Sequence, residues 1–181
     1  PASASRRHWL AGLAGTAVAT AWPLGTLAAT PAAGQGPRLI TVGGAITEVV
    51  YLLGAERQLV GSDTTSLYPP AAQQTAKVGY MRQLSAEGLL SLRPDVLVTT
   101  TEAGPTVVLD QLRSAGVRIE QVVADHQWPE VGRKVAAVGR AAGRERDAHA
   151  LQQRLEDGWK KVQARVAAHQ GRRPRVLFIL A

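Results

Sequence analysis

Residues 62–98, SDTTSLYPPAAQQTAKVGYMRQLSAEGLLSLRPDVLV, contain the turn and helix-boundary signals from which the fold of this chain is predicted. A strand is predicted to end at Leu59–Gly61, immediately before this stretch, and a buried strand follows at Val96–Val98. Between them, Ser85 can begin a short helix, which ends at Arg93–Asp95 because the residue before a proline disfavours helical geometry. The stretch therefore predicts a strand, a loop, a helix and a second strand in a parallel α/β arrangement.

The same alternation of strands and helices continues on both sides of this stretch. Strands are predicted at 38–42, 58–61, 95–100 and 117–123, and longer helices at 47–53, 105–115 and 128–142. Short crossovers between such strands are right-handed and build a parallel sheet, which binds ligands beyond the carboxyl ends of its strands. We therefore predict an α/β lobe at 38–142, with a ligand edge formed by loops 43–44, 62–70, 101–104 and 124–128.

A long polar helix and a short apolar segment follow this lobe. Residues 144–170 show helical spacing with an apolar stripe made of Ala148, Leu151, Leu155, Trp159, Val162 and Val166. Residues 175–181 are almost fully apolar, and a strand with no helix after it is usually part of a larger sheet. We interpret 143–171 as a connecting helix and 172–181 as the first strand of a second lobe that is largely absent from the chain.

The first 37 residues are predicted to be a leader and a flexible lead-in. Arg6 and Arg7 precede a weakly apolar run at 10–29, which is typical of a twin-arginine export signal. Glycines and a proline make this run a poor membrane-spanning helix. We therefore predict an export signal at 1–29, which is removed, and a flexible segment at 30–37.

The composition narrows the class of function. The 181 residues include 45% apolar residues, enough for a packed core, and carry a net charge of +7. Aromatic residues make up only 4% of the chain, which argues against a base-stacking nucleic-acid surface. The absence of cysteine excludes a disulfide, a thiolate metal site and a lipid-modified cysteine anchor within this sequence.

Two blocks carry a family resemblance: Asp63–Pro69 (DTTSLYP) and Val78–Gly88 (VGYMRQLSAEG). Together they resemble the periplasmic haem-binding proteins of bacterial haem ABC importers. The looser frame, with its Gly-Gly turn and Leu-Arg-Pro-Asp segment, is shared with cobalamin- and siderophore-binding proteins. The resemblance runs from near Leu39 to the end of the chain. It implies two α/β lobes joined by one long helix, with the ligand between the lobes.

The resemblance implies a periplasmic, monomeric binding protein rather than an enzyme. Such a protein captures haem (ferric protoporphyrin IX) and delivers it to an ABC permease and its ATPase for iron uptake, without binding nucleic acid. Two alternatives stay open. The first is a cobalamin or ferric-siderophore carrier of the same fold, and the second is an α/β enzyme such as a phosphotransferase. A Gly-Gly turn at Gly43–Gly44 can cradle a phosphate, but it can equally be a tight turn that permits close packing.

Tyr68 is the main candidate ligand of the haem iron. It lies on a loop stiffened by two prolines at the predicted ligand edge. A ferric ion favours the phenolate form of tyrosine, and tyrosine is a known axial ligand of haem iron. The alternative is a structural tyrosine whose ring packs beneath its own loop.

Other residues of the ligand edge are candidate haem contacts. Arg82 can pair with a haem propionate, because its planar guanidinium suits a carboxylate, or it can bond to loop carbonyls. Tyr80 and Met81 can form apolar walls or belong to the core. Further candidates, placed by their loops alone, are Gly44, Glu102 and, as a possible second iron ligand, His126. The last of these matches no motif of the resembled family.

Glu87 is predicted to have two compatible roles. It lies in the first turn of the helix that Ser85 begins, where a carboxylate stabilises the helix dipole. In the resembled family, an exposed glutamate at this place docks on arginines of the membrane permease. We therefore predict that Glu87 is a permease-docking residue.

Overall fold

The computed structural model describes residues 36–172 and 174–179, so the predicted export signal lies outside the described residues. Four parallel strands form one sheet in the order β2-β1-β3-β4. They are β1 (Leu39–Thr41), β2 (Leu59–Ser62), β3 (Val96–Thr100) and β4 (Arg118–Val122). The predicted parallel α/β lobe is confirmed, and each strand lies within about two residues of its expected bounds.

Burial on both faces of the sheet explains the apolar character of its central strands. Leu39 contacts one core cluster and its neighbour Ile40 contacts the other, since successive side chains of a strand point to opposite faces. Val96 and Leu97 of β3 divide in the same way. The sequences of such strands are continuous apolar runs, without the alternation of apolar and polar residues seen in strands with one exposed face.

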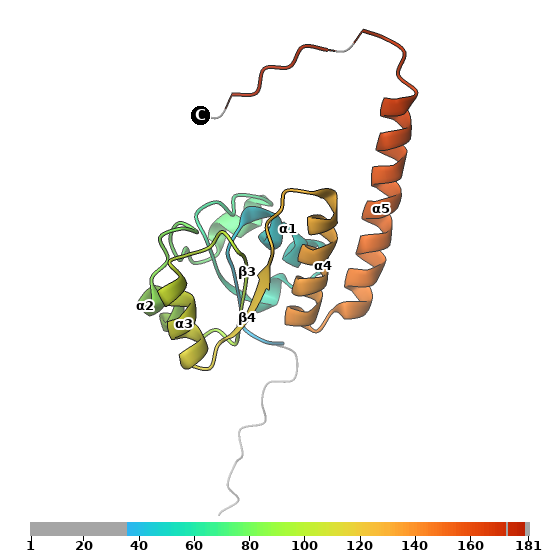
Figure 1. Cartoon of the computed structure of the whole chain (residues 1–181). Coiled ribbons are helices and arrows are strands. Elements are labelled where there is room, and N and C mark those ends of the chain that lie inside the picture. The colour runs from blue at the N-terminus through green and yellow to red at the C-terminus, as the bar shows by residue number, and fades with distance from the viewer. Residues whose placement is uncertain (1–35, 173, 180–181) are drawn as a thin grey trace, which may run out of the picture. The chain divides into compact units, whose positions relative to one another are not determined.

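Two pairs of helices cover the two faces of the sheet (Figure 1). Helices α1 (Gly44–Leu52) and α4 (Trp128–Ala142) pack on one face, while α2 (Ala86–Ser91) and α3 (Thr106–Ser114) pack on the other. The predicted start of α2 is confirmed, because Ser85 Oγ accepts a hydrogen bond from the amide of Gly88 at 3.4 Å. The sequence did not predict the two short 3-10 helices η1 (Glu56–Gln58) and η2 (Pro70–Gln74).

Helix α5 (Glu145–Ala167) confirms the helix predicted at 144–170 and lies alongside α4 (Figure 1). At one end of the contact, a Cβ on Gly139 would lie 2.5 Å from Cβ of Ala148, so glycine permits the close approach. Further along α5, Trp159 stacks on Trp128 with ring centroids 4.6 Å apart. Beyond it, Val166 is exposed. The role of α5 as a connection between two lobes stays a prediction.

The strand predicted at 172–181, as the first strand of a second lobe, stays a prediction. Residue 172 and residues 174–179 form no strand, and the apolar side chains of 176–179 are exposed. A strand needs a neighbour to satisfy its backbone donors and acceptors, and apolar composition alone does not supply one.

Within the described ranges, no helix is long and apolar enough to cross a membrane.

Candidate ligand-binding site

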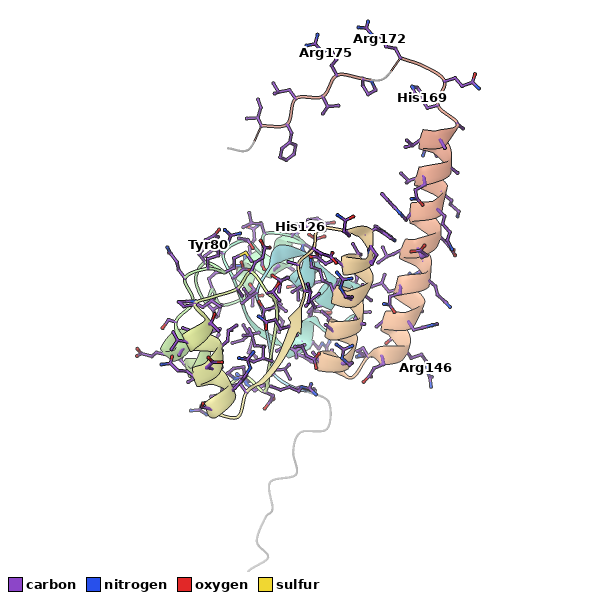
Figure 2. All side chains as sticks on the ribbon, viewed as in Figure 1. Tyr80, His126, Arg146, His169, Arg172 and Arg175 are labelled. Carbon is purple, nitrogen blue, oxygen red and sulfur yellow. The ribbon has the colours of Figure 1, made fainter. Side chains whose placement is uncertain are left out.

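The loops that follow the four strands meet at the carboxyl edge of the sheet, as parallel topology requires. The amide of Gly43, after β1, donates to Asp63 Oδ1, after β2, at 3.0 Å. The loop after β3 is paired with the 80–84 segment, because Gly104 donates to the carbonyl of Met81 and accepts from the amide of Leu84, both at 3.0 Å. Figure 2 shows Tyr80 and His126 at this same edge.

The side chain of Tyr68 projects into solvent from the loop after β2. Its exposed fraction is 65%, so its ring does not pack beneath its own loop. The structural alternative for this tyrosine is therefore wrong for the isolated chain. The loop continues directly into η2, which begins at Pro70, and Gln73 Nε2 donates to the carbonyl of Leu67 at 3.1 Å. Tyr68 thus stands on a braced loop with an accessible hydroxyl.

Gly44 packs closely against the loop that follows β2 and carries Tyr68 (residues 63–69, here called the tyrosine loop). A Cβ built at Gly44 would lie 3.0 Å from the carbonyl oxygen of Thr65. Any larger residue would therefore push the tyrosine loop away from the start of α1. This geometry supports the tight-turn interpretation of Gly43–Gly44, and the role of Gly44 as a ligand contact stays a prediction.

Arg82 has an acidic partner that its motif did not reveal. Its Nη2 donates to Glu102 Oε1 at 3.1 Å, joining the 80–84 segment to the loop after β3. The two side chains are 60% and 35% exposed, so water reaches the ion pair. Arg82 therefore binds a carboxylate. This is the chemistry predicted for its contact with a haem propionate, but the carboxylate in the structure belongs to the chain itself.

Tyr80 and Met81 differ in exposure although they are neighbours in the sequence. Tyr80 is 43% exposed, whereas Met81 is partly buried and packs against the core cluster between the sheet and helices α2 and α3. Tyr80 can therefore offer its ring to a ligand at the edge. Met81 contributes to the core and has less surface to offer.

His126 lies on the loop between β4 and α4, at the same edge. Its side chain is exposed, and its backbone has a positive φ of 55°, which is uncommon for a residue other than glycine. No group of three or more histidine and acidic residues among the described residues could hold a metal ion. The role of His126 as a second ligand of haem iron needs no such cluster and stays a prediction.

Glu130 holds the loop that carries His126. Its Oε2 accepts the amides of Asp125 at 2.9 Å and His126 at 2.6 Å, and its Oε1 lies 2.6 Å from Lys134 Nζ. Burial alone raises the pKa of Glu130, but the hydrogen bond from Lys134 and those from the two amides outweigh burial and lower the pKa to about 2. The ionised carboxylate is therefore a structural anchor of the ligand edge.

Replacing Glu130 with glutamine should lower the free energy of unfolding by about 3 kcal/mol at pH 7. The pKa of Glu130 is lower in the folded chain than the ordinary value of 4.5, so its stabilisation is complete above about pH 4.5 and is lost as the pH falls towards 2. The difference between wild type and Glu130→Gln should therefore shrink over this range. Urea unfolding at several pH values measures it. The matched control is Glu145→Gln, at an exposed acid in the first turn of α5, which should change stability little.

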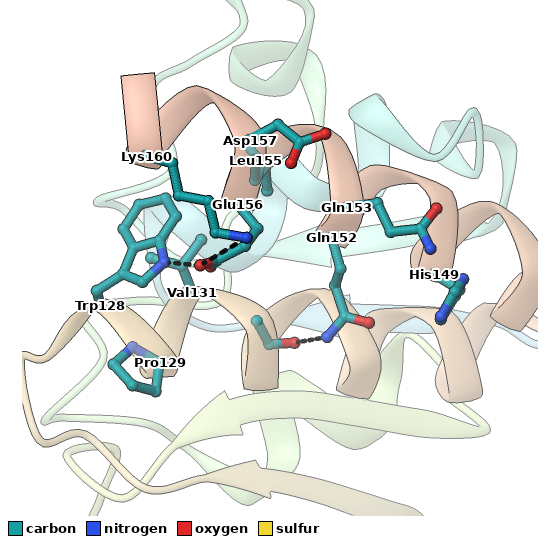
Figure 3. A pocket seen from close by; sticks show the side chains of 11 residues that line it. Trp128, Pro129, Val131, His149, Gln152, Gln153, Leu155, Glu156, Asp157 and Lys160 are labelled. Carbon is teal, nitrogen blue, oxygen red and sulfur yellow. Dashed lines mark hydrogen bonds and ion pairs between the residues drawn. The ribbon is translucent and has the colours of Figure 1, made fainter. Parts of the chain in front are cut away.

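A hollow of about 660 Å³ lies between α4 and α5 (Figure 3). Its wall includes Trp128, whose Nε1 donates to Glu156 Oε2 at 2.8 Å, and Gln152, which bonds the carbonyl of Gly132 at 2.7 Å. None of its lining residues belongs to the tyrosine loop or to the Arg82–Glu102 pair. The hollow is a gap in the packing of two helices, and of its lining residues only Trp128 belongs to the loops of the predicted ligand edge.

Glu87 is exposed in the first turn of α2, as the sequence predicts. The positive end of the dipole of α2 favours this carboxylate, although the helix has only six residues. An exposed charge here is available to another protein. Whether a permease uses it stays a prediction.

Sequence reasoning missed Asp63 and Lys77, which hold the tyrosine loop. Asp63 is fully buried, and Lys77 Nζ lies 2.9 Å from both Ser62 Oγ and the carbonyl oxygen of Ser66. A signal was present, because an acid followed by three hydroxyl residues directly after a strand favours a self-bonded turn.

A parallel α/β lobe with an exposed tyrosine and an arginine at its carboxyl edge is the architecture of a ligand-binding lobe. Residues 39–181 match the periplasmic binding protein family, and the chain belongs to that family. The family resemblance drawn from the two sequence blocks is therefore confirmed.

Relatives of this chain are named for two kinds of tetrapyrrole ligand. The periplasmic haem-binding protein BhuT, solved with two haems, is 42% identical with a TM-score of 0.71, over 74% of this chain and 51% of that one. A periplasmic haem-binding protein from Pseudomonas aeruginosa is 40% identical with a TM-score of 0.69, over 74% of this chain and 48% of that one. A vitamin B12-binding protein from Pectobacterium carotovorum is 31% identical over 98 residues, 54% of this chain and 36% of that protein. The chain thus spans about half the length of these relatives, or less.

Proposed function

We propose that this chain is one lobe of an exported solute-binding protein that captures ferric haem and delivers it to an ABC permease and its ATPase. The observation that carries the proposal is the exposed phenol of Tyr68 on a braced loop at the ligand edge. A tyrosine oxygen can bind ferric iron directly as phenolate, and an accessible hydroxyl leaves that coordination open. The flat porphyrin would lie against the edge, with Tyr80 and Gly44 beside it.

The haem assignment has a rival within the same family. The higher identity to relatives named for haem supports haem, whereas the B12-binding relative favours cobalamin as the second candidate. Cobalamin binding has no need of a tyrosine oxygen on the metal. The two candidates therefore predict different uses of Tyr68.

Titration of the chain with ferric haem and, separately, with cyanocobalamin tests the proposal. Haem should bind more tightly and should give the visible charge-transfer band and resonance Raman modes of iron bound to phenolate. Tighter binding of cobalamin, or haem bound without these signals, would contradict the proposal. In the second case, His126 becomes the residue to replace, since it is exposed at the same edge.

We further propose that Arg82 exchanges its partner when haem binds. In the ligand-free chain it bonds Glu102, and a haem propionate offers the same carboxylate chemistry from the ligand. An exposed ion pair is worth only about 0–1 kcal/mol, so the exchange costs little. Glu102 thereby keeps Arg82 at the edge while it also repels a propionate.

Replacing Glu102 with glutamine should raise haem affinity by about two- to fivefold, because the change frees Arg82 and removes the repulsion. The effect should diminish in high salt, since both side chains are exposed. Fluorescence titration at two salt concentrations measures it. The control is the same substitution in an Arg82→Met background, where the gain should be smaller. An equal gain in both backgrounds would show that Arg82 takes no part.

The remaining proposals concern the setting of the protein. We propose that it is exported to the periplasm, acts there as a monomer and is a binding protein rather than an enzyme. The names of its relatives support a binding role. The twin-arginine pattern at Arg6–Arg7 supports export. Glu87 would be the docking contact for the permease.

A further inference from the structure

Lys77 closes the base of the tyrosine loop with a single ammonium group. Its Nζ lies 2.9 Å from Ser62 Oγ, 2.9 Å from the carbonyl oxygen of Ser66 and 3.2 Å from that of Ala72. A fourth oxygen, the carbonyl of Asp63, is 3.4 Å away. Ser66 precedes Tyr68 in the chain and Ala72 follows it. The ammonium therefore joins the segment before Tyr68 (the first arm) to the segment after it (the second arm).

A cation is needed at this position for electrostatic reasons. Three backbone carbonyls from different parts of the loop converge on one point, and their negative ends repel one another unless a positive donor lies between them. An ammonium supplies three donors and one full charge, which makes these bonds stronger than neutral ones. Without it, the carbonyls of Ser66 and Ala72 would lose their common donor, and the arms would be joined only by weaker neutral bonds, such as that from Gln73 Nε2 to the carbonyl of Leu67.

Asp63 fixes the first arm of the loop independently of Lys77. Its side chain is fully buried and accepts four hydrogen bonds, from Gly43 N, Thr65 N, Thr65 Oγ1 and Ser66 Oγ, at 2.5–3.2 Å. These four donors fill the acceptor positions of the two carboxylate oxygens. The turn at 63–66 is therefore rigid. The second arm is attached separately, by neutral bonds from Gln73 to Leu67 and between the backbones of Ser62 and Ala76, and by the ammonium of Lys77.

A chain of buried hydroxyls connects this turn to the sheet. Ser66 Oγ lies 2.7 Å from Thr47 Oγ1, which lies 2.6 Å from Thr41 Oγ1, and all three residues are fully buried. Ser66 Oγ donates its one hydrogen to Asp63, so Thr47 donates to Ser66, and Thr41 donates to Thr47. A fully satisfied buried network of this kind holds one geometry. The first arm is thus continuous with β1 and α1, and Lys77 ties the second arm to it.

We propose that Lys77 is a positioning residue for Tyr68, which holds the phenol in its iron-binding place before any ligand arrives. The inference rests on the proposed function, since it assigns Tyr68 the role of iron ligand. Ordering the loop in the free chain removes an entropic cost that haem binding would otherwise bear. Lys77 touches neither iron nor porphyrin in this scheme and acts only through the loop.

The test compares Lys77→Met with wild type in two measurements on the full chain. In the ligand-free chain, amide hydrogen exchange in peptides covering 64–75 should become about tenfold faster, while α4 should be unchanged. With ferric haem, affinity should fall about tenfold and the phenolate signature should weaken. Lys161→Met, on the exposed surface of α5, is the matched control and should change neither. If Lys77→Met does not fold, Ser62→Ala removes one of the four oxygens and should give a smaller change in the same direction.

The outcomes separate this inference from the proposed function. Unchanged exchange at 64–75, or unchanged haem affinity and phenolate signature in Lys77→Met, overturns the positioning role if Tyr68→Phe still weakens binding. If Tyr68→Phe binds haem like wild type, the assignment of Tyr68 as iron ligand, which carries the proposed function, is wrong, and the positioning role fails with it. Faster loop exchange together with a weaker phenolate signature supports both.

Discussion

Replacing Tyr68 with phenylalanine should weaken ferric haem binding by this chain at least about 100-fold, or about 2.7 kcal/mol. The substitution removes one oxygen atom and keeps the ring. The loss should therefore fall on the bond to iron rather than on the apolar contact with the porphyrin. The charge-transfer band and the resonance Raman modes of iron bound to phenolate should disappear together.

The stability of the chain should hardly change in Tyr68→Phe. The side chain is 65% exposed, and substitutions at such positions usually alter the free energy of unfolding by less than about 0.5 kcal/mol. Thermal unfolding of the two ligand-free proteins checks this point. A large affinity loss at unchanged stability would separate ligand binding from folding.

Tyr80→Phe is the matched control for Tyr68→Phe. Tyr80 is another partly exposed tyrosine of the same edge, and the same atom is removed. If Tyr80 offers only its ring to the porphyrin, its affinity should stay within about twofold of wild type. An intact spectrum in Tyr68→Phe and a lost one in Tyr80→Phe would assign the iron ligand to Tyr80 instead.

The sheet could be predicted from the sequence because burial on both faces leaves a direct pattern. Val96–Val98 is a continuous apolar run, and in the structure its side chains divide between the two core clusters. The beginning of α2 could be predicted for a local reason, since Ser85 caps its own helix. Both signals can be recognised in residues that are neighbours in the sequence.

The strand predicted at 172–181 shows what composition leaves open. An apolar run satisfies the local preference for a strand, but pairing requires a second strand, and local sequence does not say whether one is present. The helix predicted just before it formed as expected, because an α-helix satisfies its hydrogen bonds within itself.

The sequence predicted the main residues of the candidate site but not the residues that bond to them, because those bonds also depend on distant parts of the chain. Tyr68 and Arg82 were chosen from motifs, and the structure places both at the carboxyl edge with exposed side chains. Their partners come from elsewhere in the chain. Glu102 is 20 residues from Arg82, and Lys77 reaches oxygens up to 15 residues away. Polar side chains in loops have many possible partners, and only the folded geometry selects among them.

Replacing Glu87 with lysine in the complete protein should abolish most haem import while haem affinity stays within about twofold of wild type. The carboxylate is exposed in the first turn of α2 and has no part in the Tyr68 loop or the Arg82–Glu102 pair. If it docks on arginines of the permease, charge reversal converts attraction into repulsion between close like charges. Such a contact costs several kcal/mol at an interface.

The loss of import should not come from unfolding. A lysine in the first turn opposes the helix dipole, which costs about 0.3–1 kcal/mol, and the core contacts of Leu89 are untouched. The control is Glu56→Lys, the same charge change in the first turn of η1, which precedes β2 at the opposite edge of the sheet. The rate of import is measured as haem uptake by cells that depend on haem for iron. The affinity is measured by haem titration of the purified variants. Import at the wild-type rate in Glu87→Lys would rule out docking through this carboxylate, and equal loss in Glu56→Lys would point to overall charge rather than to a contact at α2.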